Sequence, residues 1–316
     1  MLTAHAHAKV NLQLGVGEAR PDGFHEVASV FQALAIHDTV TLRLDDGVAV
    51  ESAVSGLTAT GLYAAGVPEE ATNLAWRAVD AVVAALRERA GGIALPTCHL
   101  VLDKGIPAAG GMAGGSADAA AALRLADAAY APLAGLPTLG DDALYEIAAR
   151  LGSDVPFTLM GGTALGTGRG EKLAPMLARG TFHWALITHA EGLSTPAVFK
   201  KLDELRAAGR GSIPHLDTTA VAHAVAAGDA EALAAALVND LQAAALSLRP
   251  DLRKILETGR AAGALQGIVS GSGPTCAFLC ADEDIAADVV AQVTADNRGT
   301  RGIITLSPAP GAALVP

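Results

Sequence analysis

The order of its predicted elements indicates an α+β protein built from two halves. The chain has 316 residues, more than a usual single domain. Its first half combines strand-like segments with helices around a glycine-rich loop, and its second half has strands of its own around alanine-rich helices. A glycine-rich stretch at residues 161–170 lies between them, so we predict two domains, residues 1–170 and 171–316.

The first half opens with a clear strand pattern. Even positions from 4 to 14 are Ala, Val or Leu, whereas the odd positions carry His5, His7, Lys9, Asn11 and Gln13. This alternation predicts a strand with one apolar face and one polar face, and we expect it to keep the Lys9 ammonium out of the core. The remaining expected elements are a turn at 20–23, strands at 27–34, 39–44 and 99–102, and helices at 116–130 and 141–151. A further helix is expected to run from a cap at Thr72 or Asn73 to about residue 90.

The second half shows the same mixture. Pro196 stands at the first position of a helix that begins at Thr195. The other expected elements are strands at 182–188, 268–270, 275–280 and 301–306, and helices within 218–263 and at 283–295. The segment after Ser307 is rich in Pro, Gly and Ala, and we expect it to be loose.

Composition excludes several classes of protein. The net charge of −11 and the lack of a Lys/Arg cluster argue against nucleic-acid binding. No window of 18 or more residues is predominantly apolar, and the first residues lack a basic segment followed by an apolar one, so we expect a cytoplasmic protein without membrane contact. Cys98, Cys276 and Cys280 have no metal-site spacing and are expected to be core residues.

The glycine-rich loop PAAGGMAGGS at residues 107–116 lies between a strand and a helix. Glycines let a bound group approach the main chain, and the helix start adds free N–H groups and the positive end of the helix dipole. We expect Ser116 to cap this helix. A Walker A loop is excluded, because Ser116 and Ala117 stand where Lys and Ser or Thr are required. The loop is therefore a predicted phosphate site, with a flexible linker as the alternative.

The loop resembles the phosphate loop of the GHMP small-molecule kinases. Four further stretches match that family in its own order: AKVNL at 8–12, RPDGFH at 20–25, LGSDVPF at 151–157 and SGSGPT at 270–275. The resemblance implies an N-terminal α/β domain and a C-terminal ferredoxin-like α+β domain, with the active site in the cleft between them. It also implies an enzyme that uses ATP and Mg²⁺ to phosphorylate the alcohol group of a small molecule.

The RPDGFH stretch narrows the implied substrate. It is similar to the branch of the family that works in non-mevalonate isoprenoid synthesis and phosphorylates the 2-hydroxyl of an acceptor with a cytidine diphosphate group. The loop departs from the family pattern, with Met112 and Ala113 in place of Leu and Gly, and Ala117 and Asp118 in place of Ser and Asn. Asp118 either points away from the nucleotide or helps to hold Mg²⁺.

The resemblance assigns the catalytic roles. It makes Asp154 the base and Lys9 the cation that lowers the pKa of the hydroxyl and neutralises developing charge. Without the resemblance, the alternative for Asp154 is a helix cap or a turn residue, since it follows a glycine at the end of a helix. Asn11 either orients the substrate or is an ordinary strand amide.

The resemblance also assigns the binding residues. Phe24 and Phe199 would sandwich the cytosine ring, with core packing as the alternative, and His25 would read its edge. The expected ATP-binding residues are Asn73, Lys104, Pro107, Gly110, Gly111, Met112, Ala113, Gly114, Gly115 and Ser116; Lys104 is otherwise a solvated charge, and Ser116 is also the candidate Mg²⁺ contact. Gly271 and Ser272 would close over the substrate end.

Three alternatives stay open. His5 and His7 share a strand face, as in some metal-dependent hydrolases, although no matching ligands follow. A sensor that binds nucleotide without catalysis, or a GHMP kinase acting on homoserine, mevalonate or galactose, would also carry the loop. The expected partner is a small molecule, and the protein is expected to be a monomer or a homodimer.

Overall fold

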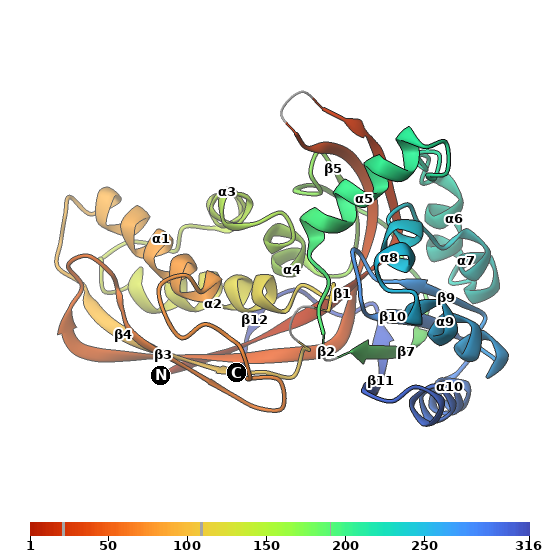
Figure 1. The fold of residues 1–316 in the computed structure, drawn as a ribbon. Coiled ribbons are helices and arrows are strands. Elements are labelled where there is room, and N and C mark those ends of the chain that lie inside the picture. The colour runs from red at the N-terminus through yellow and green to blue at the C-terminus, as the bar shows by residue number, and fades with distance from the viewer. Residues whose placement is uncertain (21–22, 108–109, 190) are drawn as a thin grey trace.

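The computed structural model describes residues 1–20, 23–107, 110–189 and 191–316. Residues 21–22 of the predicted turn and 108–109 of the glycine-rich loop lie outside the described residues, as does residue 190. The protein is α+β, as predicted, and its described residues form two sheets (Figure 1). Each sheet carries its own helices.

The first sheet is dominated by a long antiparallel pair, β1 and β2. Alternating apolar residues make these strands, because one face packs against helices while the other carries polar side chains. The sheet path is β12-β1-β2-β4-β3, with β5 paired to β2, β6 paired to β5, and β8 beside β1. Its strands are β1 (Leu2–Ala19), β2 (His25–Val48), β3 (Val54–Thr60), β4 (Pro96–Asp103), β5 (Thr163–Thr167), β6 (Lys172–Pro175), β8 (Val238–Asn239) and β12 (Ala313–Leu314).

Four helices lie along this sheet, on its upper side in Figure 1. They are α1 (Leu74–Arg89), α2 (Gly114–Tyr130), α3 (Asp141–Leu151) and α4 (Val155–Met160). Helix α2 is almost entirely buried, and its alanines let it pack closely against α1 and β1. This packing fixes the end of α2 that receives the glycine-rich loop.

The second sheet has the strand order β11-β7-β10-β9, and all its pairs are antiparallel. In chain order this is 4-1-3-2, the ferredoxin-like arrangement that the resemblance implied. Its strands are β7 (Phe182–His189), β9 (Gln266–Val269), β10 (Cys276–Cys280) and β11 (Thr300–Ser307). The helices of this half are α5 (Thr195–Ala207), α6 (Thr219–Ala227), α7 (Ala230–Ala236), α8 (Gln242–Leu248), α9 (Asp251–Ala261) and α10 (Glu283–Asp296).

The segment after Ser307 is not loose, so that expectation was wrong. Ala309 N–H donates to the carbonyl of Ala33 at 2.9 Å, and Ala312 N–H donates to the carbonyl of Thr158 at 3.0 Å. Strand β12 then pairs with β1. These contacts are made by the main chain, which composition does not reveal. The boundary at residues 170 and 171 stays a prediction, although β6 and this last segment both join the first sheet.

Within the described ranges, no helix has both the length and the hydropathy needed to cross a membrane. Cys98, Cys276 and Cys280 are buried and free, as expected. Burial raises the pKa of the Cys98 and Cys280 thiols to about 11.

Candidate active site

The glycine-rich loop is seated between β1 and the turn at residues 270–275. Gly111 has a positive φ of 75°, and a Cβ at this position would clash with the main-chain oxygen of Ser270. Ser270 Oγ donates to the carbonyl of Gly111 at 3.2 Å, and Lys9 N–H donates to the carbonyl of Met112 at 3.2 Å. Met112 itself is buried in the core. The loop is thus attached to the strand that carries Lys9.

Helix α2 starts without a side-chain cap. Its first residue is Gly114, and the N-cap is Ala113 in the left-handed conformation, with φ 63°. The prediction that Ser116 caps the helix was wrong, because Ser116 is already its third residue. The first N–H groups of an α-helix have no intrahelical acceptor, and here no side chain takes them. Such N–H groups, at the positive end of the helix dipole, are suited to bind an anion.

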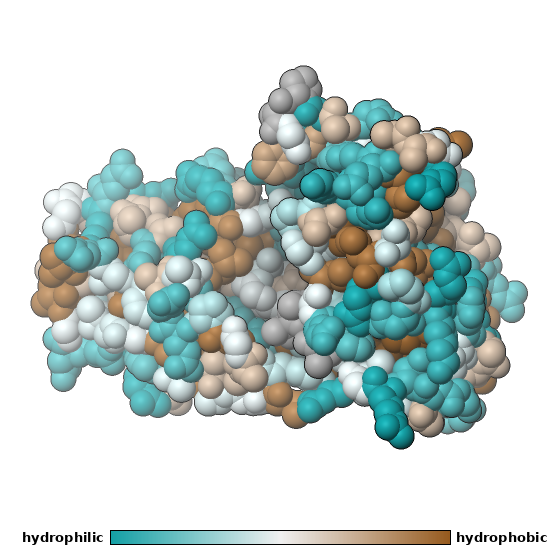
Figure 2. Space-filling model, viewed as in Figure 1, coloured by the Kyte–Doolittle hydropathy of each residue, from teal (hydrophilic) through white to brown (hydrophobic). Residues whose placement is uncertain are grey.

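Two cavities meet at this loop. One has a volume of about 370 Å³ and the other about 670 Å³. Gly111, Ala113 and Ser116 line both of them, so the loop is a shared wall. The space-filling view shows the surface hollowed between the two halves of the molecule (Figure 2).

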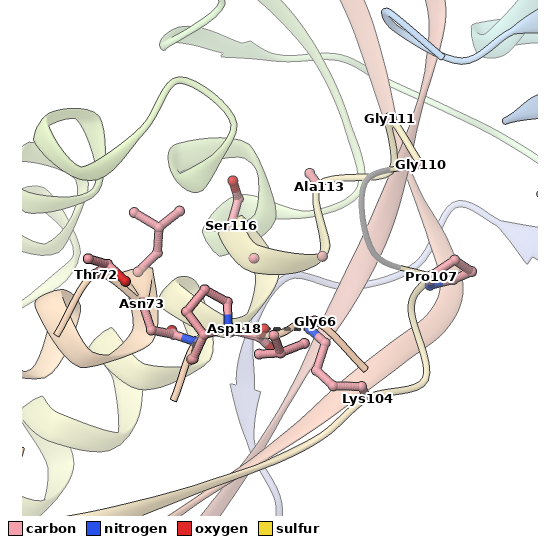
Figure 3. Close-up of a pocket in the computed structure, with 15 residues that line it drawn as sticks. Gly66, Thr72, Asn73, Lys104, Pro107, Gly110, Gly111, Ala113, Ser116 and Asp118 are labelled. Atoms are coloured by element: carbon pink, nitrogen blue, oxygen red, sulfur yellow. Dashed lines mark hydrogen bonds and ion pairs between the residues drawn. The ribbon is translucent and has the colours of Figure 1, made fainter. Parts of the chain in front are cut away.

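The smaller cavity contains most of the expected ATP-binding residues. Asn73, Lys104, Pro107, Gly110, Gly111 and Ala113 to Ser116 line it, together with residues 66–68, Thr72 and Asp118, which the sequence analysis did not assign to it. Figure 3 shows Asn73 and Lys104 approaching this cavity from different sides. Both polar groups of Asn73 are engaged: Oδ1 accepts from Ala75 N at 2.8 Å and caps α1, and Nδ2 donates to the carbonyl of Pro68 at 2.8 Å. Asn73 therefore holds the 66–72 segment at the start of α1.

Lys104 and Asp118 form a buried ion pair at the floor of this cavity (Figure 3). Lys104 Nζ also contacts Asp38, whose other oxygen accepts from Gly105 N at 2.7 Å and Ile106 N at 2.8 Å. Burial would lower the pKa of Lys104, but the two carboxylates raise it. Burial raises the pKa of Asp118 to about 7, against the opposing effect of Lys104.

This network answers the question that the sequence left open about Lys104 and gives the surroundings of Asp118. Lys104 is not a solvated charge, since its ammonium is held by two carboxylates. Asp118 holds Lys104 through Oδ2, while its buried Oδ1 has no hydrogen-bond partner among the described residues. The negative charge of the Asp118 carboxylate is therefore offset by the positive charge of Lys104.

The larger cavity brings Lys9 and Asp154 together. Lys9 Nζ lies 3.7 Å from Asp154 Oδ2 and donates to Asn11 Oδ1 at 2.7 Å. Lys9 lies on the polar face of β1, as expected, and it is only 4% exposed while it lines this cavity. Asp154 stands at the N-cap of α4, yet its side chain makes no capping bond and stays about one third exposed. The capping alternative for its carboxylate does not apply.

Asn11 fixes the position of the Lys9 ammonium. Its Nδ2 donates to Ser29 Oγ at 2.7 Å, and Ser29 Oγ donates to the carbonyl of Gln13 at 2.8 Å. These two hydrogen bonds leave the amide oxygen of Asn11 facing Lys9. An ordinary strand-edge amide would not be tied in this way.

The larger cavity is also lined by the expected substrate-binding residues Phe24, His25, Phe199, Gly271 and Ser272, of which Gly271 lies beside Lys9 and Asn11. Phe24 is 51% exposed and is not a core residue. The Phe199 and His25 rings lie 5.2 Å apart. Ser272 Oγ is 2.8 Å from Thr195 Oγ1, which connects the 270–275 turn to the start of α5.

Sequence reasoning missed three charged residues that line this cavity: Arg169, Lys200 and Asp203. Arg169 lies over the Phe24 ring, 5.6 Å from its centroid. His25 Nε2 lies 2.9 Å from Asp203 Oδ1. A signal for Asp203 existed, because it follows Phe199 by four residues and so shares its face of α5.

His5 and His7 do not form a metal site. The His5 and His7 rings pack against His37, with centroids 4.3 Å and 5.3 Å apart. Burial, with smaller effects from His37 and His5, lowers the pKa of His7 to about 4. Among the residues that the structure describes, no group of three or more His, Cys, Asp or Glu side chains could hold a metal ion.

The arrangement suits phosphoryl transfer. An anion site at a helix start adjoins a second cavity in which an ammonium and a carboxylate lie side by side. Transfer of a phosphoryl group needs mainly this: positioning, positive charge near the transferred group, and an acceptor for the proton of the attacking hydroxyl.

Comparison with known proteins places the chain in a class. The family model described as GHMP kinases N terminal domain matches residues 73–162, and the one described as GHMP kinases C terminal matches residues 221–298. The chain belongs to the GHMP kinases, a family of ATP-dependent kinases.

Similar proteins narrow the comparison. A protein from Corynebacterium diphtheriae named 4-diphosphocytidyl-2-C-methyl-D-erythritol kinase is 55% identical over 301 residues, which are 94% of this chain and 93% of that protein. A crystal structure of 4-(cytidine 5'-diphospho)-2C-methyl-D-erythritol kinase matches with a TM-score of 0.73 and 29% identity over 98% of this chain and 100% of its own. A homoserine kinase from Cytophaga hutchinsonii shares the fold, with a TM-score of 0.70 and 17% identity over 99% and 97% of the two chains.

Proposed function

We propose that this kinase transfers the γ-phosphoryl group of ATP to the 2-hydroxyl of 4-diphosphocytidyl-2-C-methyl-D-erythritol, a step of non-mevalonate isoprenoid synthesis. The names of its similar proteins support this substrate. The observation that carries the proposal is the shared wall: one loop lines both a cavity at a helix start and a cavity with Lys9 and Asp154.

In the proposed reaction ATP occupies the smaller cavity, with its phosphates against the first N–H groups of α2. The acceptor occupies the larger cavity, with its hydroxyl between Asp154 and the loop. The hydroxyl oxygen forms a bond to the γ-phosphorus, the bond from that phosphorus to the bridging oxygen of ADP breaks, and Asp154 takes the proton. Lys9 steadies the carboxylate and offsets the growing negative charge.

Mg²⁺ fits this site through Ser116. Its hydroxyl lies where the two cavities meet, and Mg²⁺ prefers such oxygen ligands together with phosphate oxygens and water. When bound, the ion neutralises charge on the phosphates. The chain's own part is to hold the loop, and Thr158 supports this by donating from Oγ1 to the carbonyl of Ser116 at 3.0 Å.

The part of the larger cavity around Phe24 and Phe199 favours a substrate with a flat base over a small amino acid or a simple alcohol. Phe24 and Phe199 line it, and a base stacked on an aromatic ring gains about 1–3 kcal/mol. The 670 Å³ volume is also large for homoserine or mevalonate. The cytoplasmic location and the monomeric or dimeric state stay predictions.

A panel of alcohol acceptors with ATP and Mg²⁺ tests the proposal, with ADP release as the signal. We expect turnover with 4-diphosphocytidyl-2-C-methyl-D-erythritol and little with homoserine, mevalonate or galactose. Preferred turnover of one of the other acceptors would overturn the proposed substrate.

A further inference from the structure

Asp203 lies beside His25, and both residues line the larger cavity. The His25 side chain is buried, with 5% of its surface exposed, and its Nε2 lies 2.9 Å from Asp203 Oδ1. In the described part of the chain, Asp203 is the one side chain that bonds to this ring. An ionised carboxylate only accepts hydrogen bonds, so the ring hydrogen belongs on Nε2.

The fold holds this pair in place. Asp203 belongs to α5, and Arg206 of the same helix donates to the carbonyls of Gly17 at 2.8 Å and Val16 at 2.6 Å. These bonds tie α5 to β1, the hairpin partner of the strand that begins at His25. Figure 1 shows α5 beside the upper part of this hairpin. The backbone arrangement therefore keeps the positions of Asp203 and His25 side by side.

We propose that Asp203 is a specificity-determining residue: by holding the hydrogen of His25 on Nε2, it leaves Nδ1 as an acceptor for the exocyclic amino group of a cytosine base. This inference rests on the proposed function. Cytosine carries an amino donor at position 4, whereas uracil carries a carbonyl acceptor there. In this tautomer Nδ1 can therefore accept a hydrogen bond from cytosine. With uracil, Nδ1 and the carbonyl oxygen are both acceptors, so no hydrogen bond forms between them.

Stacking cannot make this distinction. Phe24 and Phe199 offer flat faces that accept any base. To bind uracil by a hydrogen bond, His25 would have to move its hydrogen to Nδ1, which would place the Nε2 lone pair against the Asp203 carboxylate. Asp203 penalises this change through its bond to the His25 ring, in the way that a carboxylate bonded to a metal-bound histidine fixes its tautomer.

Asp203→Asn is the sharpest test. The amide keeps the size of the side chain, but it can turn to accept from Nε2 or to donate to it, so it supports both tautomers. Asp203→Ala removes the partner altogether. Glu204→Gln is the matched control, because it removes one charge from the next residue of α5, whose carboxylate pairs with Lys201. Calorimetric titration with CDP and with UDP gives the ratio of the two affinities.

We expect the wild-type protein and Glu204→Gln to bind CDP more tightly than UDP. In Asp203→Asn and Asp203→Ala the ratio should fall about tenfold, the order of one hydrogen bond. An unchanged ratio in both variants would overturn the role of Asp203. A loss of affinity for both nucleotides by the same factor would do so as well, since it would show a structural role only.

The free protein gives an independent measurement. The ¹⁵N chemical shifts of the His25 ring distinguish the two tautomers, and we expect the hydrogen on Nε2 in the wild type. A hydrogen on Nδ1 would overturn the inference whatever the substrate is. Turnover separates the two proposals: an active wild type with unchanged ratios in the variants refutes only the role of Asp203, whereas a wild type that neither binds CDP nor phosphorylates the acceptor refutes both.

Discussion

Replacing Asp154 with asparagine should separate catalysis from folding. Its carboxylate lies 3.7 Å from Lys9 Nζ, caps no helix through its side chain and is 34% exposed. Lys9 is buried but keeps its bond to Asn11, so we expect loss of the partly exposed carboxylate to cost about 1 kcal/mol, which for a protein of this size corresponds to about 4 °C or less in Tm. A general base contributes about 10² to 10⁴ to the rate, or about 2.7 to 5.5 kcal/mol of transition-state stabilisation.

We therefore expect Asp154→Asn to lower kcat by about 10² to 10⁴ while Tm hardly changes. ATP affinity should survive, because Asp154 does not line the smaller cavity. Coupled measurement of ADP release gives the rate, and calorimetric titration gives the ATP affinity. Asp141→Asn is the control, since Asp141 is an exposed first-turn residue of α3 whose carboxylate pairs with Arg124. A variant with full turnover would show that this carboxylate is not the base.

Three further substitutions test the loop and the histidine cluster. Gly111→Ala should lower the free energy of unfolding by about 2 kcal/mol or more and weaken ATP binding, because the new Cβ would clash with the Ser270 main chain. Gly115→Ala is the control, since a Cβ at that position meets no close neighbour. Equal losses in the two variants would contradict this reasoning. Ala113→Gly should raise the free energy of unfolding by about 0.5–1 kcal/mol in urea titration, since it relieves a left-handed residue, whereas a decrease would argue against the strain. The pKa of His7 is lowered from 6.5 to about 4, so the unfolded chain takes up the proton first, and stability is complete above pH 6.5 and falls as the pH approaches 4. Between pH 7 and pH 4 the wild type should lose about 1–2 kcal/mol more of its unfolding free energy than His7→Gln, an amount reduced by the partial exposure of the ring. Equal losses in the two proteins would refute this effect of His7.

Much of the fold could be predicted, because its elements depend on local patterns. The alternation along β1 and the cap residue before α1 can be recognised from neighbouring residues alone, and both elements lie where they were expected. The end of the chain was missed because main-chain hydrogen bonds, not side chains, attach it to β1 and β2. The start of α2 was missed because a left-handed Ala113 replaces the side-chain cap that Ser116 suggested.

The site could be predicted only as far as motifs reach. Lys9, Asp154 and the glycine-rich loop belong to matching stretches, and the structure places all three around two adjoining cavities. The network of Lys104 with Asp38 and Asp118 joins three distant segments, and no pattern within one segment reveals it. The contact of His25 with Asp203 spans 178 positions and depends on how α5 lies against β1.

The pairing of β12 with β1 has a consequence for synthesis on the ribosome. Strand β1 emerges first, but its neighbour on this edge emerges after every other strand of the sheet. Until then β1 presents unpaired N–H and C=O groups near Ala4 and His5, and such an open edge recruits strands from other chains. A nascent chain stalled before residue 313 is therefore more prone to aggregation than the finished protein, even if all its helices have formed.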